Sequence, residues 1–208
     1  MGSRDDKYVQ DLLELYFEVK AYYILSERLI EKYPISLKNE MNNAFDHLMR
    51  ALRSKNQENS SLYISEIDSC VRHLKRAGYD CCELIFLYYV SHYQNIISMY
   101  SVDVISYIYP KHFTDDIILI DSLKKKVQQI AFDKQHNPTV ASKEDMYDEF
   151  DLVIKDIEAI YQNVNRITPA LENYKIKVNR RKIRETVILL VTAVVSTIIG
   201  VILTILLS

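Results

Sequence analysis

Two short segments of the chain repeat one pattern of acidic, imidazole and guanidinium side chains. The motif H-L-x-R-A occurs at 47–51 and again 26 residues later at 73–77, and a glutamate lies seven residues before each histidine. Seven residues are close to two turns of an α-helix, so each glutamate and histidine share a face, and the arginine follows one turn further. The two rows are Glu40, His47, Arg50 and Glu66, His73, Arg76.

These rows support two interpretations, and the sequence leaves both open. If the two helices form an antiparallel hairpin, the rows meet, and hydrogen bonds between them fix the register of the helices. Alternatively, the arginines and histidines form an anion or nucleotide site, because guanidinium groups match phosphate oxygens and imidazole can share a proton near neutral pH. No nucleophile lies at a fixed spacing from either histidine, so we predict no catalytic residue in the rows.

Motifs of the common enzyme classes are absent from the sequence. Three glycines cannot supply a Gly-rich phosphate loop, and no H-E-x-x-H, G-x-S-x-G or kinase signature occurs. The acidic residues at 145–151 lack the glycine and the spacing of a calcium loop, and the three cysteines lack the paired spacing of a zinc site. We therefore predict no metal and no cofactor, and an enzyme is not the expected class.

Composition indicates helices, and the charge divides along the chain. The 208 residues include three Gly, four Pro and no Trp, and 49% are apolar, which excludes all-β, collagen-like and disordered classes. Residues 1–174 hold 20 basic and 27 acidic side chains. This acidic body repels phosphate backbones, so nucleic acid is an unlikely partner. Cys70, Cys81 and Cys82 are expected to be reduced, buried thiols.

The C-terminal segment is typical of a membrane-spanning helix. Residues 186–207 form 22 uncharged positions, about 33 Å of helix, against a hydrocarbon layer about 30 Å thick. Cations immediately before the span place the N-terminal part in the cytoplasm by the positive-inside rule, which makes the segment a tail anchor. We expect this basic collar to contact lipid headgroups. The collar consists of Lys175, Lys177, Arg180, Arg181, Lys182 and Arg184.

Small and hydroxylated residues recur every four positions inside this span. Such a stripe lets two helices approach closely, which predicts self-association and a homo-oligomer. One alternative is that the hydroxyls only bond to their own helix, and a weaker one is that several copies line a narrow pore. The stripe consists of Thr192, Ser196, Gly200 and Thr204.

Apolar periodicity and the prolines predict the remaining helices. Helices are expected over 5–32, 36–53, 62–100 and 115–132, with 84–90 as the most buried piece, and a last long helix leads toward the membrane. The predicted fold is all-α: a multi-helix up-and-down bundle in the cytoplasm over 1–168, a polybasic connector over 169–185 and one transmembrane helix over 186–208. Pro169 is expected to interrupt and kink the last helix.

The helix over 147–167 carries two apolar rows. One row follows a 3-4 spacing from Tyr147 to Val164, and a second, of Val153, Ile160 and Ile167, repeats every seven residues. Two rows suit a helix that packs on its own domain with one side and on a partner protein with the other. The alternative is a single wide face within the core of the domain.

The first copy of the repeat, A-x-x-H-L-x-R-A, resembles HEPN-like helical domains of prokaryotic toxin, CRISPR-associated and antiphage proteins. The resemblance covers residues 36–100 and implies an up-and-down helical bundle that is often dimeric. Ribonuclease members of that family carry an arginine followed four to six residues later by a histidine. Here Arg72 directly precedes His73, and no histidine follows Arg76 before His92, so the ribonuclease motif is absent.

These features lead to three functional hypotheses. The preferred one is a tail-anchored helical protein that self-associates and acts at the membrane, as a membrane-perturbing effector in prokaryotic antiphage defence. The second is a SNARE-like fusion or tethering protein, because a bundle, a heptad helix, basic residues and a span occur in that order. The third is a HEPN-like nucleotide-binding sensor that uses the two His-Arg rows.

Overall fold

The computed structural model is all-α over the residues that it describes, which are 2–30, 35–56, 60–136 and 143–207. It contains six α-helices and one π-helical turn in this range. In chain order these are α1 (Gly2–Ile30), α2 (Ile35–Asn56), α3 (Ser60–Ser98), α4 (Val102–Ile108), η1 (His112–Asp116), α5 (Ile117–His136) and α6 (Lys143–Leu207).

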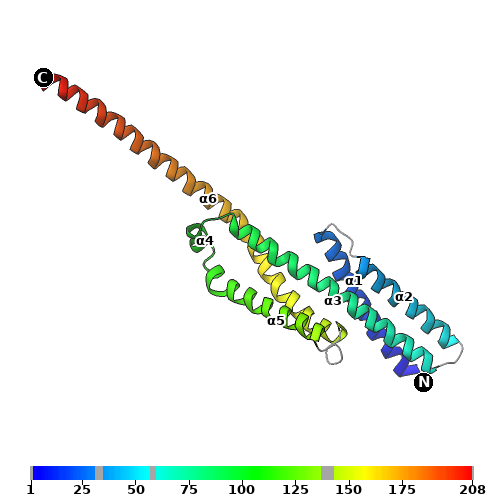
Figure 1. Cartoon of the computed structure of the whole chain (residues 1–208). Helices are drawn as coiled ribbons and strands as arrows, with labels where there is room; N and C mark the ends of the chain where they lie inside the picture. The colour runs from blue at the N-terminus through cyan, green and yellow to red at the C-terminus, as the bar shows by residue number, and fades with distance from the viewer. Residues whose placement is uncertain (1, 31–34, 57–59, 137–142, 208) are drawn as a thin grey trace.

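An elongated bundle holds the first 170 residues, and the end of α6 protrudes from it (Figure 1). The long α3 runs through the middle of the bundle, where α1, α2 and α6 pack along it. Beside the point where α6 leaves the bundle, α4 and η1 fold across the end of α3, and α5 turns back along α6. The predicted helical bundle with one long apolar C-terminal helix is therefore confirmed as architecture.

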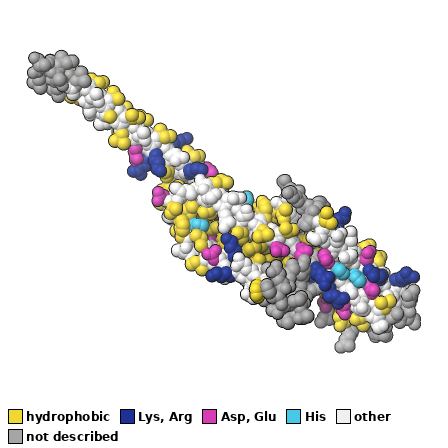
Figure 2. All heavy atoms as spheres, in the orientation of Figure 1, with side chains coloured by type: hydrophobic (Ala, Val, Ile, Leu, Met, Phe, Trp, Pro, Cys, Tyr) yellow, Lys and Arg dark blue, Asp and Glu magenta, His cyan; other side chains and the backbone are white. Residues whose placement is uncertain are grey.

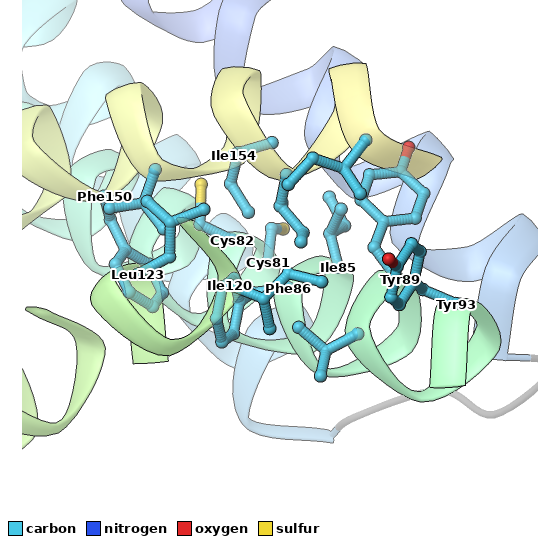
Figure 3. Close-up of a cluster of buried hydrophobic side chains, with 14 of the residues drawn as sticks. Cys81, Cys82, Ile85, Phe86, Tyr89, Tyr93, Ile120, Leu123, Phe150 and Ile154 are labelled. Atoms are coloured by element: carbon cyan, nitrogen blue, oxygen red, sulfur yellow. The ribbon is translucent and has the colours of Figure 1, made fainter. Parts of the chain in front are cut away.

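The main core lies between α3 and α6. Cys81, Cys82 and Ile85 of α3 face Phe150 and Ile154 of α6, all at 0–1% exposure (Figure 3). The three free cysteines are buried, and burial raises the pKa of Cys70 to about 11 and that of Cys81 to about 12. These thiols are therefore protonated and unreactive near neutral pH.

Gly78 lies where the backbone of α3 and the ring of Tyr147 in α6 are in close contact. It lies inside the 39-residue α3, where glycine weakens a helix by about 1 kcal/mol relative to alanine. A Cβ atom placed there would stand 2.4 Å from Cε2 and 2.7 Å from Cδ2 of Tyr147. The helix tolerates a poor helix former at this position because the aromatic ring of α6 occupies the space.

Three sequence expectations need correction. The segment 84–90 is not buried throughout, because Leu87 is 57% exposed while Ile85 and Phe86 are buried. Val102–Ile108 form α4 and His112–Asp116 form η1, whereas the sequence predicts no helix between residues 100 and 115. Finally, α6 continues through Pro169, which lies inside the helix. Pro169 is exposed, so water can hydrate the carbonyl group that loses its N–H donor, and no buried hydrogen bond is lost.

Candidate functional site

The structure brings the two Glu-His-Arg rows together between α2 and α3. His47 Nδ1 lies 2.6 Å from Oε2 of Glu66, and His73 Nδ1 lies 2.6 Å from Oε2 of Glu40. The two imidazole rings stack between these pairs, with centroids 5.1 Å apart and planes inclined by 19°. Each histidine thus bonds the glutamate of the opposite helix, and the two pairs are reciprocal.

The arginines lie at the margin of this pairing. Arg50 Nε is 3.8 Å from Oε2 of Glu66 and donates a hydrogen bond to the carbonyl oxygen of Asp46 at 3.3 Å, and its side chain is 57% exposed. Arg76 is half-buried on α3. The carboxylates of Glu40 and Glu66 already occupy Nδ1 of both imidazole rings and place acidic groups where an incoming anion would have to bind. This geometry suits a polar seam that fixes the register of α2 and α3 better than an anion site.

Removing one carboxylate of the seam tests this interpretation. We expect Glu66→Ala to lower the free energy of unfolding by about 1–2 kcal/mol, because a partly buried His47 loses its charge-assisted partner. Arg50→Ala is the matched control and should change it by less than about 0.5 kcal/mol, because the exposed ion pair is screened by water. Thermal unfolding in detergent measures both variants. If Arg50→Ala lowers the free energy of unfolding as much as Glu66→Ala does, the interpretation of the rows as a polar seam is contradicted.

The basic collar and the stripe both lie on the protruding part of α6. Every collar residue is exposed except Lys175, which is half-buried with its Nζ 5.2 Å from the centroid of the Tyr100 ring. Among the described side chains the collar pairs with one acid, through Arg181 Nε and Glu185 Oε1 at 2.8 Å. Figure 2 shows the dark blue collar at the base of the protruding helix and apolar side chains beyond it.

The described residues of the stripe lie on the exposed surface of α6. Thr192, Ser196 and Gly200 are exposed, and a Cβ added at Gly200 would meet nothing within 4 Å. The Thr192 hydroxyl donates to the carbonyl oxygen of Ile188 at 2.8 Å, as expected where a hydroxyl only bonds its own helix. Thr204 lies within α6, but its side chain falls outside the described residues.

Among the described helices, α6 is long and apolar enough to cross a membrane. An 18-residue window of this helix has a mean hydropathy of 1.8, and none of that window is buried. A soluble protein would have to hide such a helix in its core. The structure therefore contains one candidate membrane span in the part of the chain that it describes.

Both apolar rows of 147–167 pack within this chain. Phe150, Val153 and Ile157 have 0% exposure, and Ile160 has 4%. Leu152, on the other side of the helix, is 57% exposed. The rows thus form one wide core face, and a partner protein at 147–167 would have to contact other residues of this helix.

A second polar cluster, which sequence reasoning missed, lies beneath α4. Asp116 Oδ2 accepts hydrogen bonds from the hydroxyls of Tyr109 and Tyr93, the latter at 3.4 Å. The Tyr93 hydroxyl also contacts Nδ1 of His112. His112 and Asp116 are only 7% and 2% exposed, and the π-helical turn η1 presents both to the core. Such turns are frequent at functional sites.

A cavity of about 340 Å³ adjoins this cluster. Tyr93 and His112 line it from the polar cluster, Ile97 and Ile120 supply apolar walls, and Lys124 lies at its edge. A small ligand could occupy this volume. The available sequence signal was the spacing of four residues from His112 to Asp116, shortly after Pro110, but the third member, Tyr93, is distant in the chain.

Burial makes His112 a source of pH-dependent stability. Desolvation lowers the pKa of His112 below its usual 6.5, and the charge of Asp116 offsets this only in part. The unfolded chain therefore binds a proton more readily than the folded chain. We expect the free energy of unfolding to be constant above about pH 6.5 on this account and to decrease as the pH falls below it.

The variant His112→Gln isolates this contribution. Chemical denaturation of both proteins between pH 5 and 7.5 should show a shallower decline for the variant on the acid side. Equal slopes would mean that His112 is not responsible.

A second cavity, of about 320 Å³, lies at the other end of the bundle between α1, α2 and α3. Its walls are apolar and include Leu12, Leu48, Ile67 and the buried thiol of Cys70. It contains no ionisable side chain besides thiol and phenol groups. Among the described residues, no group of three or more His, Cys, Asp or Glu side chains is arranged to hold a metal ion.

Fold and site together define the class: an all-helical protein with a paired His-Glu seam and a candidate membrane span. Comparisons with protein-family models, with curated proteins and with solved structures found no match. The resemblance to HEPN-like domains therefore stays a prediction.

Proposed function

We propose that this chain is a tail-anchored membrane protein that self-associates and acts on the membrane. The helical bundle lies in the cytoplasm, residues 186–208 form the anchor, and several copies together perturb the bilayer. The proposal includes the setting in which such a protein would act, as an effector of prokaryotic antiphage defence.

The uncovered end of α6 carries this proposal. Every described side chain from Asn179 to Gly200 is exposed, although most of those after Glu185 are apolar. Exposing this surface to water costs about 25 cal/mol for each Å² of apolar area, whereas lipid removes that cost. Six cations precede the apolar part, as they do at the cytoplasmic end of membrane helices.

The stripe supports self-association. Close helix packing in lipid depends on small residues that let two backbones approach, and even a Cβ atom added at Gly200 would meet nothing within 4 Å. A single span cannot enclose water, so a membrane-perturbing protein with one span requires several copies. The resemblance to antiphage proteins supports the biological setting.

The two alternative functions have less support. A SNARE-like protein must offer its heptad helix to partners, but the rows at 147–167 are buried in the bundle. A nucleotide sensor must offer its histidines to a phosphate, but Nδ1 of each histidine is paired with the glutamate of the opposite helix.

Dye leakage tests the membrane mechanism. The full chain and a chain ending at Glu185 would be expressed in cells and added to dye-loaded vesicles. We expect leakage from the full chain only, because the shorter chain lacks the anchor. A full chain with Gly200→Ile is the control for association and should leak less while remaining in the membrane. Equal behaviour of the full and shortened chains would contradict the proposal.

A further inference from the structure

The end of the bundle from which α6 emerges carries exposed apolar side chains. We call this end the tip, defined by four side chains that are each more than half exposed. Their exposures are 57% for Met99, 65% for Val102, 69% for Tyr107 and 65% for Ile118. Figure 2 shows apolar side chains gathered beside the base of the protruding helix, where Figure 1 places α4.

Two side-chain contacts hold the tip against α6. The Tyr100 hydroxyl donates to Oε1 of Glu172 at 2.9 Å, and the rings of Tyr107 and Tyr174 stack with centroids 4.5 Å apart. The tip therefore has a defined position on α6, twelve residues before the span begins at Thr186.

The short helix α4 exposes two large apolar side chains together with two polar ones, Asp103 and Ser106. Val104 and Ile105 are 3% exposed and face the core, whereas Val102 and Tyr107 face outward. A surface helix of a water-soluble domain would carry polar side chains on its outer side. The outer side of α4 combines these polar groups with exposed Val102 and Tyr107, a mixture that suits the interface between water and lipid.

Cations accompany this apolar surface. Lys111 is exposed between α4 and η1, and Lys175 lies over the Tyr100 ring. Lys182 follows Lys175 by seven residues and so shares its face of α6. Residues 99–119 alone carry one exposed cation and two exposed carboxylates, Asp103 and Asp115, so the cation excess comes from the adjoining collar: with residues 172–185 included there are seven cations and four carboxylates that are not buried. Apolar and aromatic side chains among excess cations match the headgroup layer of an anionic membrane.

We propose that the tip docks onto the headgroup layer of the anionic bilayer that its own span crosses. This inference rests on the membrane anchor of the proposed function. Twelve helical residues put the tip about 18 Å from the hydrocarbon if α6 stands upright, whereas the headgroup layer is only about 5–8 Å thick. Membrane helices tilt by about 20° on average and by up to about 40°. A tilt of α6 toward α4 near the upper end of this range, with the axis of α4 about 10 Å to the side of α6, lowers the tip to about 7 Å above the hydrocarbon, which is within the headgroups, and fixes the orientation of the bundle.

Spin labels on introduced cysteines can measure the depth of the tip. The native cysteines are buried with raised pKa values, so a thiol reagent near neutral pH labels only an added, exposed cysteine. The full chain would carry a label at Val102 or Ile118. Matched controls are Ile64, which is exposed near the opposite end of α3, and Val195 in the span. Each protein is placed in vesicles of phosphatidylcholine with phosphatidylglycerol.

Collision with oxygen, which concentrates in lipid, is compared with collision with a water-soluble nickel chelate. We expect the ratio of oxygen collisions to nickel collisions to be several-fold higher for labels at Val102 and Ile118 than for the label at Ile64. In vesicles of phosphatidylcholine alone this difference should disappear. If the labels at both tip positions collide with the nickel chelate as often as a label in water does, while the label at Val195 collides mainly with oxygen, the docking is overturned but the anchor is not. A water-like value at Val195 would overturn both proposals. Spin–spin coupling between labels at the tip would show that two copies meet there, if the coupling disappears when labelled chain is diluted with unlabelled chain. That result would assign the tip to a second copy and overturn lipid docking.

Discussion

Replacing Gly78 by alanine is expected to destabilise the bundle by about 2 kcal/mol, although alanine is the better helix former. The new methyl group would overlap the ring of Tyr147, and overpacking of this kind costs about 1–3 kcal/mol or more. The ring cannot move freely, because it is 1% exposed and its hydroxyl donates to Oε1 of Glu18 at 2.9 Å. The higher helix propensity of alanine offsets about 1 kcal/mol of this cost in unfolding free energy. Thermal unfolding in detergent measures the net effect.

A double-mutant cycle assigns the cause of this loss. In a Tyr147→Ala background the methyl group meets open space, so Gly78→Ala should be neutral or stabilising by up to about 1 kcal/mol. The interaction energy between the two sites should then exceed about 2 kcal/mol. If Gly78→Ala costs the same in both backgrounds, the close contact between α3 and α6 is not the reason for the glycine.

Replacing Phe150 by alanine should have the largest effect of any single core substitution considered, about 3–5 kcal/mol. The Phe150 side chain has 0% exposure, stacks on Tyr79 with centroids 5.2 Å apart and contacts Phe86. Its removal leaves a cavity where α3, α5 and α6 meet (Figure 3). Loss of this size would lower the midpoint of thermal unfolding by about 6–20 °C.

Leu152→Ala is the matched control in the same helix. Its side chain is 57% exposed, so we expect a change below about 0.5 kcal/mol. Similar losses for Phe150→Ala and Leu152→Ala would indicate that α6 packs in a different rotation from the one described.

Features that depend on neighbours along the chain could be predicted from the sequence. The positions of α1, α2 and α3 follow from the 3.6-residue period, and the span follows from 22 uncharged residues. The pairing of histidines and glutamates in the seam could also be predicted, because the spacing between Glu40 and His47 recurs between Glu66 and His73. Two helices with the same spacing can pair reciprocally only in an antiparallel arrangement.

Features assembled from distant residues could not be predicted in this way. Tyr93 lies 19 residues before His112 and 23 before Asp116, and the π-helical turn that aims them inward has no periodic signature. The length of α6 was also missed, because Pro169 predicts a break. The hydrogen-bond penalty of a proline is small when its surroundings are exposed, and the packing of Val164 and Leu171 on either side keeps the helix intact.

The central claim is that the end of α6 resides in lipid. Its most direct test is extraction of membranes at alkaline pH, with the intact chain compared with a variant carrying Val194→Lys and Val195→Lys. Each lysine at the centre of a span costs about 2.5–3.5 kcal/mol of insertion free energy, so the variant should shift to the supernatant. The intact chain should remain in the membrane pellet. Recovery of the intact chain in the supernatant would contradict the account.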